Sequence, residues 1–257
     1  MFIEKIKSYI DSYCPWARRP AKIFYLAVWG SVFSHNLRRL AGVYGTGKAD
    51  THNYATHYQQ HFADKRLQPL KILEIGVGGY DDPLQGGSSL RMWKRFFPKA
   101  EVFGIDIHDK SAIAESRITI MQGSQNDTDF LQEVVSRIGP IDIVIDDGSH
   151  INSDVLKSFE FLFPYLDENG TYVIEDTQTS YWPKYGGDSY SLSKPSTTMG
   201  YFKSLVDGLN YEEIARSSFT PSYLDMHINS IHFYHNMIFI QKGLNKEGSK
   251  YSLKHKY

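Results

Sequence analysis

From residue 71 onward, short apolar runs alternate with segments of helical pattern, and this alternation constrains the fold more than any other feature. Five of the runs predict buried strands: 71–76, 101–107, 117–122, 141–146 and 171–176. Helical patterns lie between several of them, at 89–97, 128–138 and 155–166. Strands that alternate with helices pair in parallel and carry helices on both faces, so we expect an α/β domain.

The two ends of the chain depart from this alternation. Near the C-terminal end, the runs 230–234 and 237–242 are separated only by His235 and Asn236, which predicts an antiparallel hairpin. The first part of the chain lacks the strand rhythm altogether. We therefore expect a helical appendage over residues 1–43, followed by the main domain over residues 44–257.

The first forty residues are unusually basic. They hold seven basic and two acidic residues, a local excess of +5 in a chain whose net charge is −1. Basic pairs flank the apolar run 23–33, which is shorter than the about 20 residues that a membrane-spanning helix needs. Such a segment either lies on an anionic membrane surface or packs as a helix against the main domain or a sister subunit. Both interpretations stay open, and homo-oligomer formation stays open with the second.

The composition narrows the class of protein. A near-neutral chain lacks the global electrostatic footprint of a nucleic-acid binder, so we expect no nucleic acid among the partners. Cys14 is the only cysteine, which leaves neither a disulfide within one chain nor a cysteine metal cluster. The start of the chain has no long apolar segment of the secretory type. We therefore expect a cytoplasmic protein, membrane-peripheral if residues 1–43 lie on a bilayer.

A glycine-rich loop follows the first predicted strand. Gly76, Gly78 and Gly79 allow a tight turn and a close approach of the backbone to a ligand at the carboxyl edge of the sheet. A dinucleotide site would place a third glycine where this chain has Asp81, and the neighbouring Asp82 would also repel a pyrophosphate. S-adenosylmethionine (SAM) carries a sulfonium and no phosphate, so the acidic surroundings favour SAM. We assign Glu74, at the end of the same strand, to this cofactor site.

Asp106 closes the second predicted strand, about thirty residues after the glycine loop. A carboxylate at that point can accept hydrogen bonds from both ribose hydroxyls of a nucleoside cofactor. The same logic serves NAD and SAM, so Asp106 supports a nucleoside cofactor without choosing between the two.

Acidic residues end the fourth and fifth predicted strands. Asp146 and Asp147 follow one strand, and Glu175 and Asp176 follow the next. Parallel neighbours end at the same edge of a sheet, so Asp147, Glu175 and Asp176 can converge there. Converging carboxylates repel one another unless a cation neutralises them. Oxygen ligands suit a hard divalent ion, so we expect Mg²⁺, with Mn²⁺ as the alternative.

His150 lies three residues beyond Asp147. If a short helical turn follows Gly148, the two residues share a face and the imidazole points into the same pocket. An alcohol is a poor nucleophile until its proton is removed, and imidazole is suited to accept a proton at neutral pH. We therefore predict that His150 is a general base beside a metal ion.

Four segments together resemble a known family. They are G-V-G-G-Y-D-D-P, G-G-S-S-L-R-M-W, I-D-D-G-S-H and E-D-T-Q-T-S-Y-W-P, and the likeness runs from about Tyr44 to about Asp207. The combination resembles the metal-dependent sugar O-methyltransferases of macrolide biosynthesis, with related motifs in rhamnosyl O-methyltransferases and cephalosporin-hydroxylase-like proteins. The resemblance implies a Rossmann-like class I methyltransferase fold, a seven-stranded, mostly parallel sheet with a C-terminal antiparallel hairpin.

The resemblance also implies roles for individual residues. Transfer of the SAM methyl group to a sugar hydroxyl would use Mg²⁺ held by Asp147, Glu175 and Asp176, with His150 as the base. Further residues are expected at the cofactor: Asp146, and the loop residues Gly123, Ser124 and Gln125 beside the adenine. Residues 44–54 would form part of an active-site cover. In the long loop 179–196, Tyr181, Trp182 and Tyr185 are expected to bind the acceptor, because aromatic rings stack on sugars.

Three other functions compete with a sugar O-methyltransferase acting on a small molecule or glycan. A catechol or other small diol could replace the sugar, because neighbouring oxygens would chelate the metal in either case. A nicotinamide-dependent oxidoreductase is disfavoured by Asp81 in the glycine loop. A SAM-binding protein without catalysis is disfavoured because the expected base and metal ligands are all in the sequence.

Overall fold

The computed structural model describes residues 18–49, 52–216 and 218–249. The chain divides into two compact units. Among the described residues, the helical unit holds 18–49, 52–68 and 91–98, and the sheet unit holds 69–90, 99–216 and 218–249. Cys14 and the first basic residues lie outside the described residues. The boundary that we predict between residues 43 and 44 stays a prediction.

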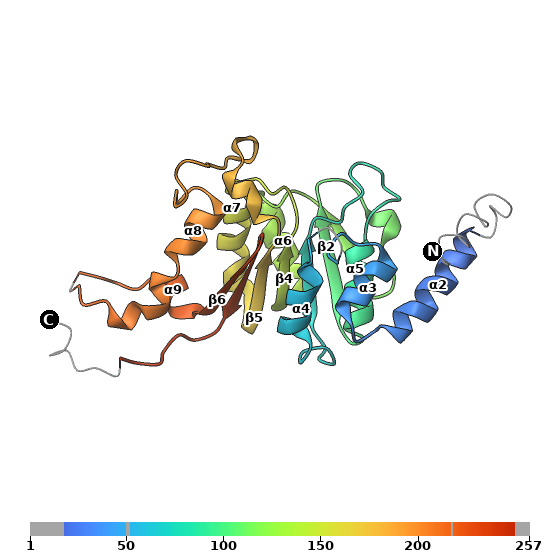
Figure 1. Ribbon diagram of the computed structural model, residues 1–257, viewed down its shortest axis with the longest axis horizontal. Helices are drawn as coiled ribbons and strands as arrows, with labels where there is room; N and C mark the ends of the chain where they lie inside the picture. The colour runs from blue at the N-terminus through green and yellow to red at the C-terminus, as the bar shows by residue number, and fades with distance from the viewer. Residues whose placement is uncertain (1–17, 50–51, 217, 250–257) are drawn as a thin grey trace. The chain divides into compact units, whose positions relative to one another are not determined.

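The sheet unit is built on one seven-stranded sheet with the order β3-β2-β1-β4-β5-β7-β6. Its strands are β1 (Lys71–Ile75), β2 (Glu101–Asp106), β3 (Ile118–Gln122), β4 (Ile141–Asp146), β5 (Leu166–Ile174), β6 (Ile228–Tyr234) and β7 (Met237–Lys242). The first five pair in parallel, whereas β7 is antiparallel to both β5 and β6. The alternation and the late hairpin predicted from the sequence are both confirmed (Figure 1).

Helices cover the sheet between its strands. The helices of the sheet unit are α6 (Thr128–Ile138), α7 (Asn152–Leu162), α8 (Thr198–Ser204) and α9 (Tyr223–His227), joined by short 3₁₀ turns, and α5 (Ser88–Phe96) begins in this unit. α6 begins where the Asp127 side chain accepts the amides of Asp129 and Phe130. α6 and α7 lie next to each other, and their apolar faces join those of the central strands in one core (Figure 1).

Two predicted boundaries differ from the structure. The helix predicted over 155–166 ends at Leu162, and a 3₁₀ turn over Phe163–Tyr165 follows, because Pro164 has no amide hydrogen to continue a helix. β5 then begins at Leu166, five residues earlier than predicted. The strand contains an irregularity at which Asn169 lies in the left-handed region (φ 66°).

The order of the strands brings the ends of β1, β4 and β5 to one edge of the sheet. The amide of Asp147 donates to the carbonyl of Ile75, and the amide of Glu175 donates to that of Asp146. These bonds carry the parallel pairing just beyond the ends of the strands. Open α/β sheets bind ligands at this carboxyl edge, where the strand order reverses direction.

The helical unit contains α2 (Arg18–Val32), α3 (Leu37–Tyr44), α4 (Tyr54–Phe62) and the last residues of α5. Its core is aromatic, with Trp93 packed edge-on against Tyr58 at 4.8 Å between ring centroids. Asn36 caps α3 by accepting the amide of Arg39, and Gly45 ends the helix in the left-handed region. Among the described residues, no helix is both long enough and apolar enough to cross a bilayer.

Candidate metal and cofactor site

Three side chains that could ligate a metal gather at the carboxyl edge of the sheet. Asp147, His150 and Asp176 each offer one ligand atom, and these atoms all lie within 4.8 Å of one another. Nε2 of His150 is 3.6 Å from a carboxylate oxygen of Asp176 and 4.0 Å from one of Asp147. All three side chains are partly buried. The two carboxylates at this spacing are suited to hold a divalent cation, and the imidazole lies beside them.

The backbone at two of these residues is strained. His150 and Asp176 both lie in the left-handed region, with φ angles of 56° and 54°. Residues other than glycine rarely adopt this conformation, and such strain is concentrated at functional sites. The helical turn that we expected after Gly148 is absent: residues 147–150 are irregular and α7 begins at Asn152. His150 therefore approaches Asp147 through its left-handed backbone and not through a shared helix face.

Glu175, predicted as a third carboxylate ligand, does not belong to this group of ligand atoms. It is the last residue before the strained Asp176 and is only 4 % exposed. The role of Glu175 as a ligand stays a prediction.

A buried polar network lies directly behind the candidate metal ligands. Asp146, 1 % exposed, accepts hydrogen bonds from Ser158 Oγ (2.8 Å), Gln125 Nε2 (3.1 Å) and Tyr172 Oη (3.4 Å). Burial raises the pKa of Asp146 to about 6, against the opposing effect of the hydrogen bond from Ser158. Burial and the nearby Asp146 also raise the pKa of Tyr172. This network fixes the end of β4, from which the metal-binding segment continues.

Gln125 connects this network to the backbone that carries His150. Its Oε1 atom accepts the amide of Ser149 at 2.7 Å, while its Nε2 atom donates to Asp146. A Cβ atom added at Gly148 would lie 2.1 Å from the same Oε1 atom, so this approach requires the glycine. The sequence suggested Gln125 and Asp146 as cofactor neighbours, and that role stays a prediction beside the structural one.

The glycine loop passes close to the metal-binding segment. Gly76 has φ 91°, and a Cβ atom added there would lie 2.1 Å from the carbonyl oxygen of Asp147. Gly79 is similarly enclosed, because its added Cβ would lie 2.4 Å from the backbone of Gln85. Gly78 has a left-handed backbone but open space around it. The loop therefore leaves room beside Gly78, as a cofactor cradle requires. Glu74 is fully buried in β1.

Lys110 holds the far side of this loop. Its side chain is fully buried, and its Nζ atom donates to the carbonyl oxygens of Asp82 (2.7 Å) and Gln85 (3.3 Å). A buried ammonium must find acceptors, and the turn of the loop supplies them. Sequence reasoning missed Lys110, since a lone lysine after a strand carries no signal of this contact.

Asp106 lies at the end of β2, beside the glycine loop that follows β1. One carboxylate oxygen accepts the amide of Val77 and the other accepts the amide of His108, both at 2.9 Å. These bonds hold the carboxylate in place and occupy only part of its acceptor capacity. The remaining capacity is open to further donors, and ribose binding by Asp106 stays a prediction.

The loop after β3 continues this edge. The amide of Gly123 donates to the carbonyl of Asp106 at 2.9 Å, and a Cβ atom added at Gly123 would overlap the ring of Phe130. Ser124 is partly exposed. Its place beside the adenine, like that of Gly123, stays a prediction.

The long loop after β5 is organised by one buried amide. Asn152 Nδ2 donates to the carbonyls of Thr179 (3.2 Å) and Tyr185 (2.8 Å), and its Oδ1 atom accepts the amide of Thr198 (2.7 Å). Tyr181, Trp182 and Tyr185, predicted to bind the acceptor, lie on the segment held in this way, and Trp182 is exposed. The sequence gave no sign of Asn152, because its three partners are distant along the chain.

Comparison with known proteins identifies relatives of high similarity. The mycinamicin VI 2''-O-methyltransferase of Micromonospora griseorubida is 47% identical over 215 residues, which cover 83% of this chain and 54% of that protein. The demethylmacrocin O-methyltransferase of Streptomyces fradiae is 48% identical over 215 residues, with the same two coverages. The 8-demethyl-8-alpha-L-rhamnosyl tetracenomycin-C 2'-O-methyltransferase of Streptomyces olivaceus is 46% identical over 210 residues, covering 81% and 55%.

Solved structures agree with these relatives. The MycE methyltransferase in complex with Mg, SAH and mycinamycin VI superposes with a TM-score of 0.81 at 45% identity, covering 95% of this chain and 62% of that one. A second MycE structure, with Mg and SAH, gives a TM-score of 0.80 and covers 83% and 56%. This chain thus spans little more than half the length of the curated relatives that it matches. No protein-family model matches the chain.

Proposed function

The chain belongs to the family of sugar O-methyltransferases that act on macrolide and tetracenomycin glycosides, and the similarity to the mycinamicin enzyme covers 83% of its length. From this membership we propose the reaction that the chain itself catalyses. It transfers the methyl group of SAM to a hydroxyl of a sugar, with a divalent cation, Mg²⁺ or Mn²⁺, at the carboxyl edge of the sheet. The acceptor is a glycosylated small molecule, a glycolipid or a polysaccharide.

One observation carries this proposal: the convergence of Asp147, His150 and Asp176 within 4.8 Å at the edge where the glycine loop turns. The convergence joins residues that follow the ends of β4 and β5, and two of them adopt strained backbones. Backbone strain of this kind is concentrated at functional sites, so it is not expected in a group of surface carboxylates without a function. The bonds that fix Asp106 beside the glycine loop complete the match to a nucleoside cofactor.

The residues of the site have separate roles in the reaction. Asp147 and Asp176 hold the cation, which when bound makes the acceptor hydroxyl more acidic. His150 accepts the hydroxyl proton at Nε2, so that the oxygen can attack the methyl group in line. The sulfonium leaves as a neutral thioether. Nothing covalent is required of the protein, and positioning and electrostatics account for the rate.

The aromatic segment after β5 positions the acceptor. Trp182 and Tyr185 lie 6.0 Å apart between ring centroids, and Tyr181 ends the preceding turn. Rings of this kind stack on the apolar faces of a sugar, and the names of two relatives include a rhamnosyl and an olivosyl group. We assign the acceptor sugar to this segment.

The test is a methyl-transfer assay with labelled SAM and rhamnosylated or deoxysugar-bearing acceptors. Product formation is expected with Mg²⁺ and is expected to stop on addition of EDTA, with mass spectrometry locating one added methyl group on the sugar. The variant Lys157→Gln, a change at an exposed position of α7, serves as a control and should keep the same methyl-transfer activity. Turnover that persists in EDTA would contradict the proposed role of the metal, and methylation of a catechol in preference to every sugar would contradict the acceptor class.

The partners of residues 1–43 are a separate part of the proposal. Contact of this segment with a membrane surface and self-association are the two options that its basic and apolar residues support. Sedimentation velocity of the full chain, alone and with vesicles, distinguishes them: growth in mass without vesicles indicates self-association.

A further inference from the structure

The surface of α2 exposes an unusual amount of apolar side chain. Ile23, Phe24 and Val32 are 61 %, 70 % and 51 % exposed, and Val28 and Trp29 are also exposed. On this helix Gly30 is buried, and it faces Tyr44 and Arg95 within the helical unit. Soluble proteins seldom leave several large apolar side chains of one helix uncovered, and where they do it commonly marks an interaction site.

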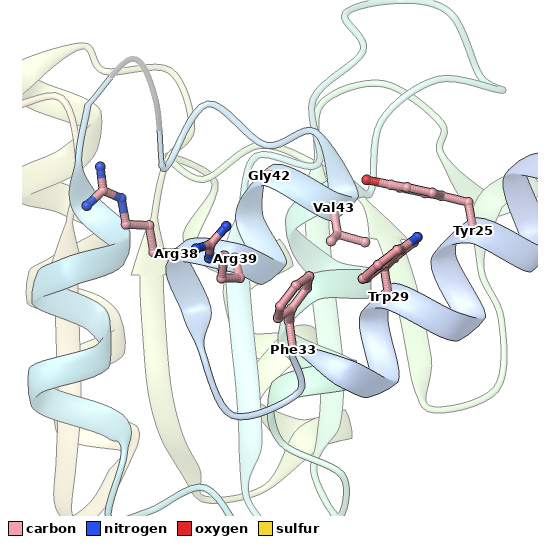
Figure 2. A pocket seen from close by; sticks show the side chains of 7 residues that line it. All are labelled: Tyr25, Trp29, Phe33, Arg38, Arg39, Gly42 and Val43. Atoms are coloured by element: carbon pink, nitrogen blue, oxygen red, sulfur yellow. The ribbon is translucent and has the colours of Figure 1, made fainter. Parts of the chain in front are cut away.

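A hollow of about 590 Å³ lies between α2 and α3, within the helical unit. One wall is formed by Tyr25 and Trp29 of α2 and by Phe33 just beyond its end, each four residues after the last. Arg39 and Val43 of α3 form the other wall (Figure 2). Tyrosine and tryptophan combine an apolar ring with a polar edge, and this is why they accumulate at the boundary between lipid tails and water.

Cationic groups lie at the rim of this hollow. Arg38 and Arg39 are both exposed, and the guanidinium carbon of Arg39 lies 5.7 Å from the centre of the Phe33 ring. Phe33 is in turn stacked on Trp29, with 5.7 Å between ring centroids. The arginine head is thus supported by the aromatic wall and still available to an anion, and guanidinium is well suited to bind phosphate.

The charge around this surface is strongly one-sided. Residues 12–49 contain six basic residues and no acidic residue, although the whole chain has a net charge of −1. An anionic partner therefore complements the segment. A symmetric contact between two copies would bring two such positive surfaces together, which is unfavourable. A nucleic acid would leave the exposed aliphatic groups of Ile23 and Val32 without a partner.

The dimensions of α2 decide how it can meet a lipid surface. The helix has 15 residues, which at 1.5 Å per residue extend for about 22 Å, less than the hydrocarbon core of a bilayer. It can lie in the interface with its apolar side chains among the acyl chains, and basic residues beside it then reach the headgroups.

We propose that the surface formed by α2 and α3 docks the protein on an anionic phospholipid bilayer. The exposed apolar residues of α2 enter the interface, and a lipid phosphate occupies the hollow beside Arg38 and Arg39. This docking surface is independent of methyl transfer, because it uses no residue of the metal and cofactor site. It would bring the enzyme to acceptors that are themselves amphiphilic.

The test is co-sedimentation of the full chain with vesicles of phosphatidylcholine, with and without phosphatidylglycerol, in the absence of SAM and metal. The full chain is expected to bind the anionic vesicles, to bind neutral ones at least about tenfold more weakly, and to dissociate as salt is added. Arg38→Gln combined with Arg39→Gln should weaken binding to anionic vesicles roughly 10- to 30-fold. Ile23→Gln combined with Phe24→Gln should weaken it similarly without changing the charge.

The matched control combines Arg137→Gln with Lys157→Gln, which removes two exposed charges from α6 and α7 of the sheet unit. It should bind anionic vesicles like the unmodified chain, and melting curves should show that all the variants fold. Full binding by both α2 and α3 variants, or no binding by the unmodified chain, would overturn the proposal. A dimer in solution that the α2 variant converts to monomer, with no vesicle binding, would show an interface between copies and would overturn it too.

Methyl transfer measured on a soluble glycoside separates this proposal from the proposed function. The α2 and α3 variants should keep that activity whether or not they bind vesicles. If transfer is absent and vesicle binding is present, the proposed function fails and the docking surface stands; the reverse result rejects the docking surface alone.

Discussion

The side-chain amide of Asn152 donates a hydrogen bond of 2.8 Å to the carbonyl oxygen of Tyr185, which lies 33 residues further along the chain. The same residue also bonds Thr179 and Thr198, so one buried side chain holds both ends of the aromatic loop. Asn152 lies two residues beyond His150. The proposed base and the proposed acceptor segment are therefore positioned from one point at the start of α7.

We predict that Asn152→Asp impairs acceptor binding more than cofactor binding. The substitution keeps the oxygen that accepts the amide of Thr198, but it places a second oxygen against the carbonyls of Thr179 and Tyr185, which repels both. The KM for the acceptor should rise by about tenfold or more, as expected when buried hydrogen bonds become repulsions, with the KM for SAM unchanged. Steady-state kinetics with each substrate varied in turn provides the measurement.

The same chemical change at an exposed position serves as the control. Asn210→Asp, in the 3₁₀ segment before α9, should leave both KM values as they are. Equal increases in the two KM values for Asn152→Asp would show a general loss of structure and would count against a specific positioning role.

We predict that Asp176 and Glu175 differ in their importance for metal binding. Asp176 has an oxygen within the group of ligand atoms that includes His150, whereas Glu175 does not belong to it. Asp176→Asn should reduce Mg²⁺ affinity by more than the roughly 10- to 100-fold typical of residues that only support a ligand. Glu175→Gln should have a smaller effect. Isothermal titration with Mg²⁺ gives both affinities.

Thermal melting gives a second measure of the same difference. Mg²⁺ binds the folded chain and so should raise its melting temperature, and this increase should disappear in Asp176→Asn. Asparagine tolerates the left-handed backbone that Asp176 adopts, so the variant should still fold without metal. Loss of the Mg²⁺ response in Glu175→Gln to the same extent would show that Glu175 is a ligand, as the sequence alone suggested.

We predict that His150→Asn removes the proton acceptor and preserves the fold. His150 is left-handed (φ 56°), a conformation in which asparagine is several-fold enriched, so the backbone cost of the change is small. If His150 is the general base, kcat should fall by about 10²- to 10⁴-fold. Binding of S-adenosylhomocysteine should stay unchanged. A variant that retains more than a tenth of the kcat would exclude His150 as the base.

The sheet and the convergence of its acidic residues could be predicted because both follow from short-range patterns. Apolar runs such as 141–146 are local, and parallel strands necessarily end at one edge, so Asp147 and Asp176 meet there. The supporting contacts could not be predicted in this way. Gln125 meets Asp146 and Ser149 across more than twenty residues, and nothing in their local sequence identifies that pairing.

Backbone conformation was a second limit. Asp147 and His150 were expected to share a helix face, yet their approach depends on a left-handed residue that is not glycine. Propensity disfavours that conformation, so only the packing of the surrounding residues can impose it. The glycines were more informative, since Gly76 and Gly79 occupy positions where a side chain cannot fit.

Gly76 and Gly78 provide a last prediction, because both are left-handed but differ in the space around them. A Cβ atom added at Gly76 would lie 2.1 Å from the carbonyl oxygen of Asp147, whereas one added at Gly78 meets no atom within 4 Å. Gly78→Ala should therefore cost only the backbone strain, about 1–2 kcal/mol in the free energy of unfolding. Gly76→Ala should cost more and should also displace Asp147 and weaken Mg²⁺ binding. Urea denaturation and Mg²⁺ titration measure the two effects, and equal losses of stability in both variants would contradict the close approach of the glycine loop to Asp147.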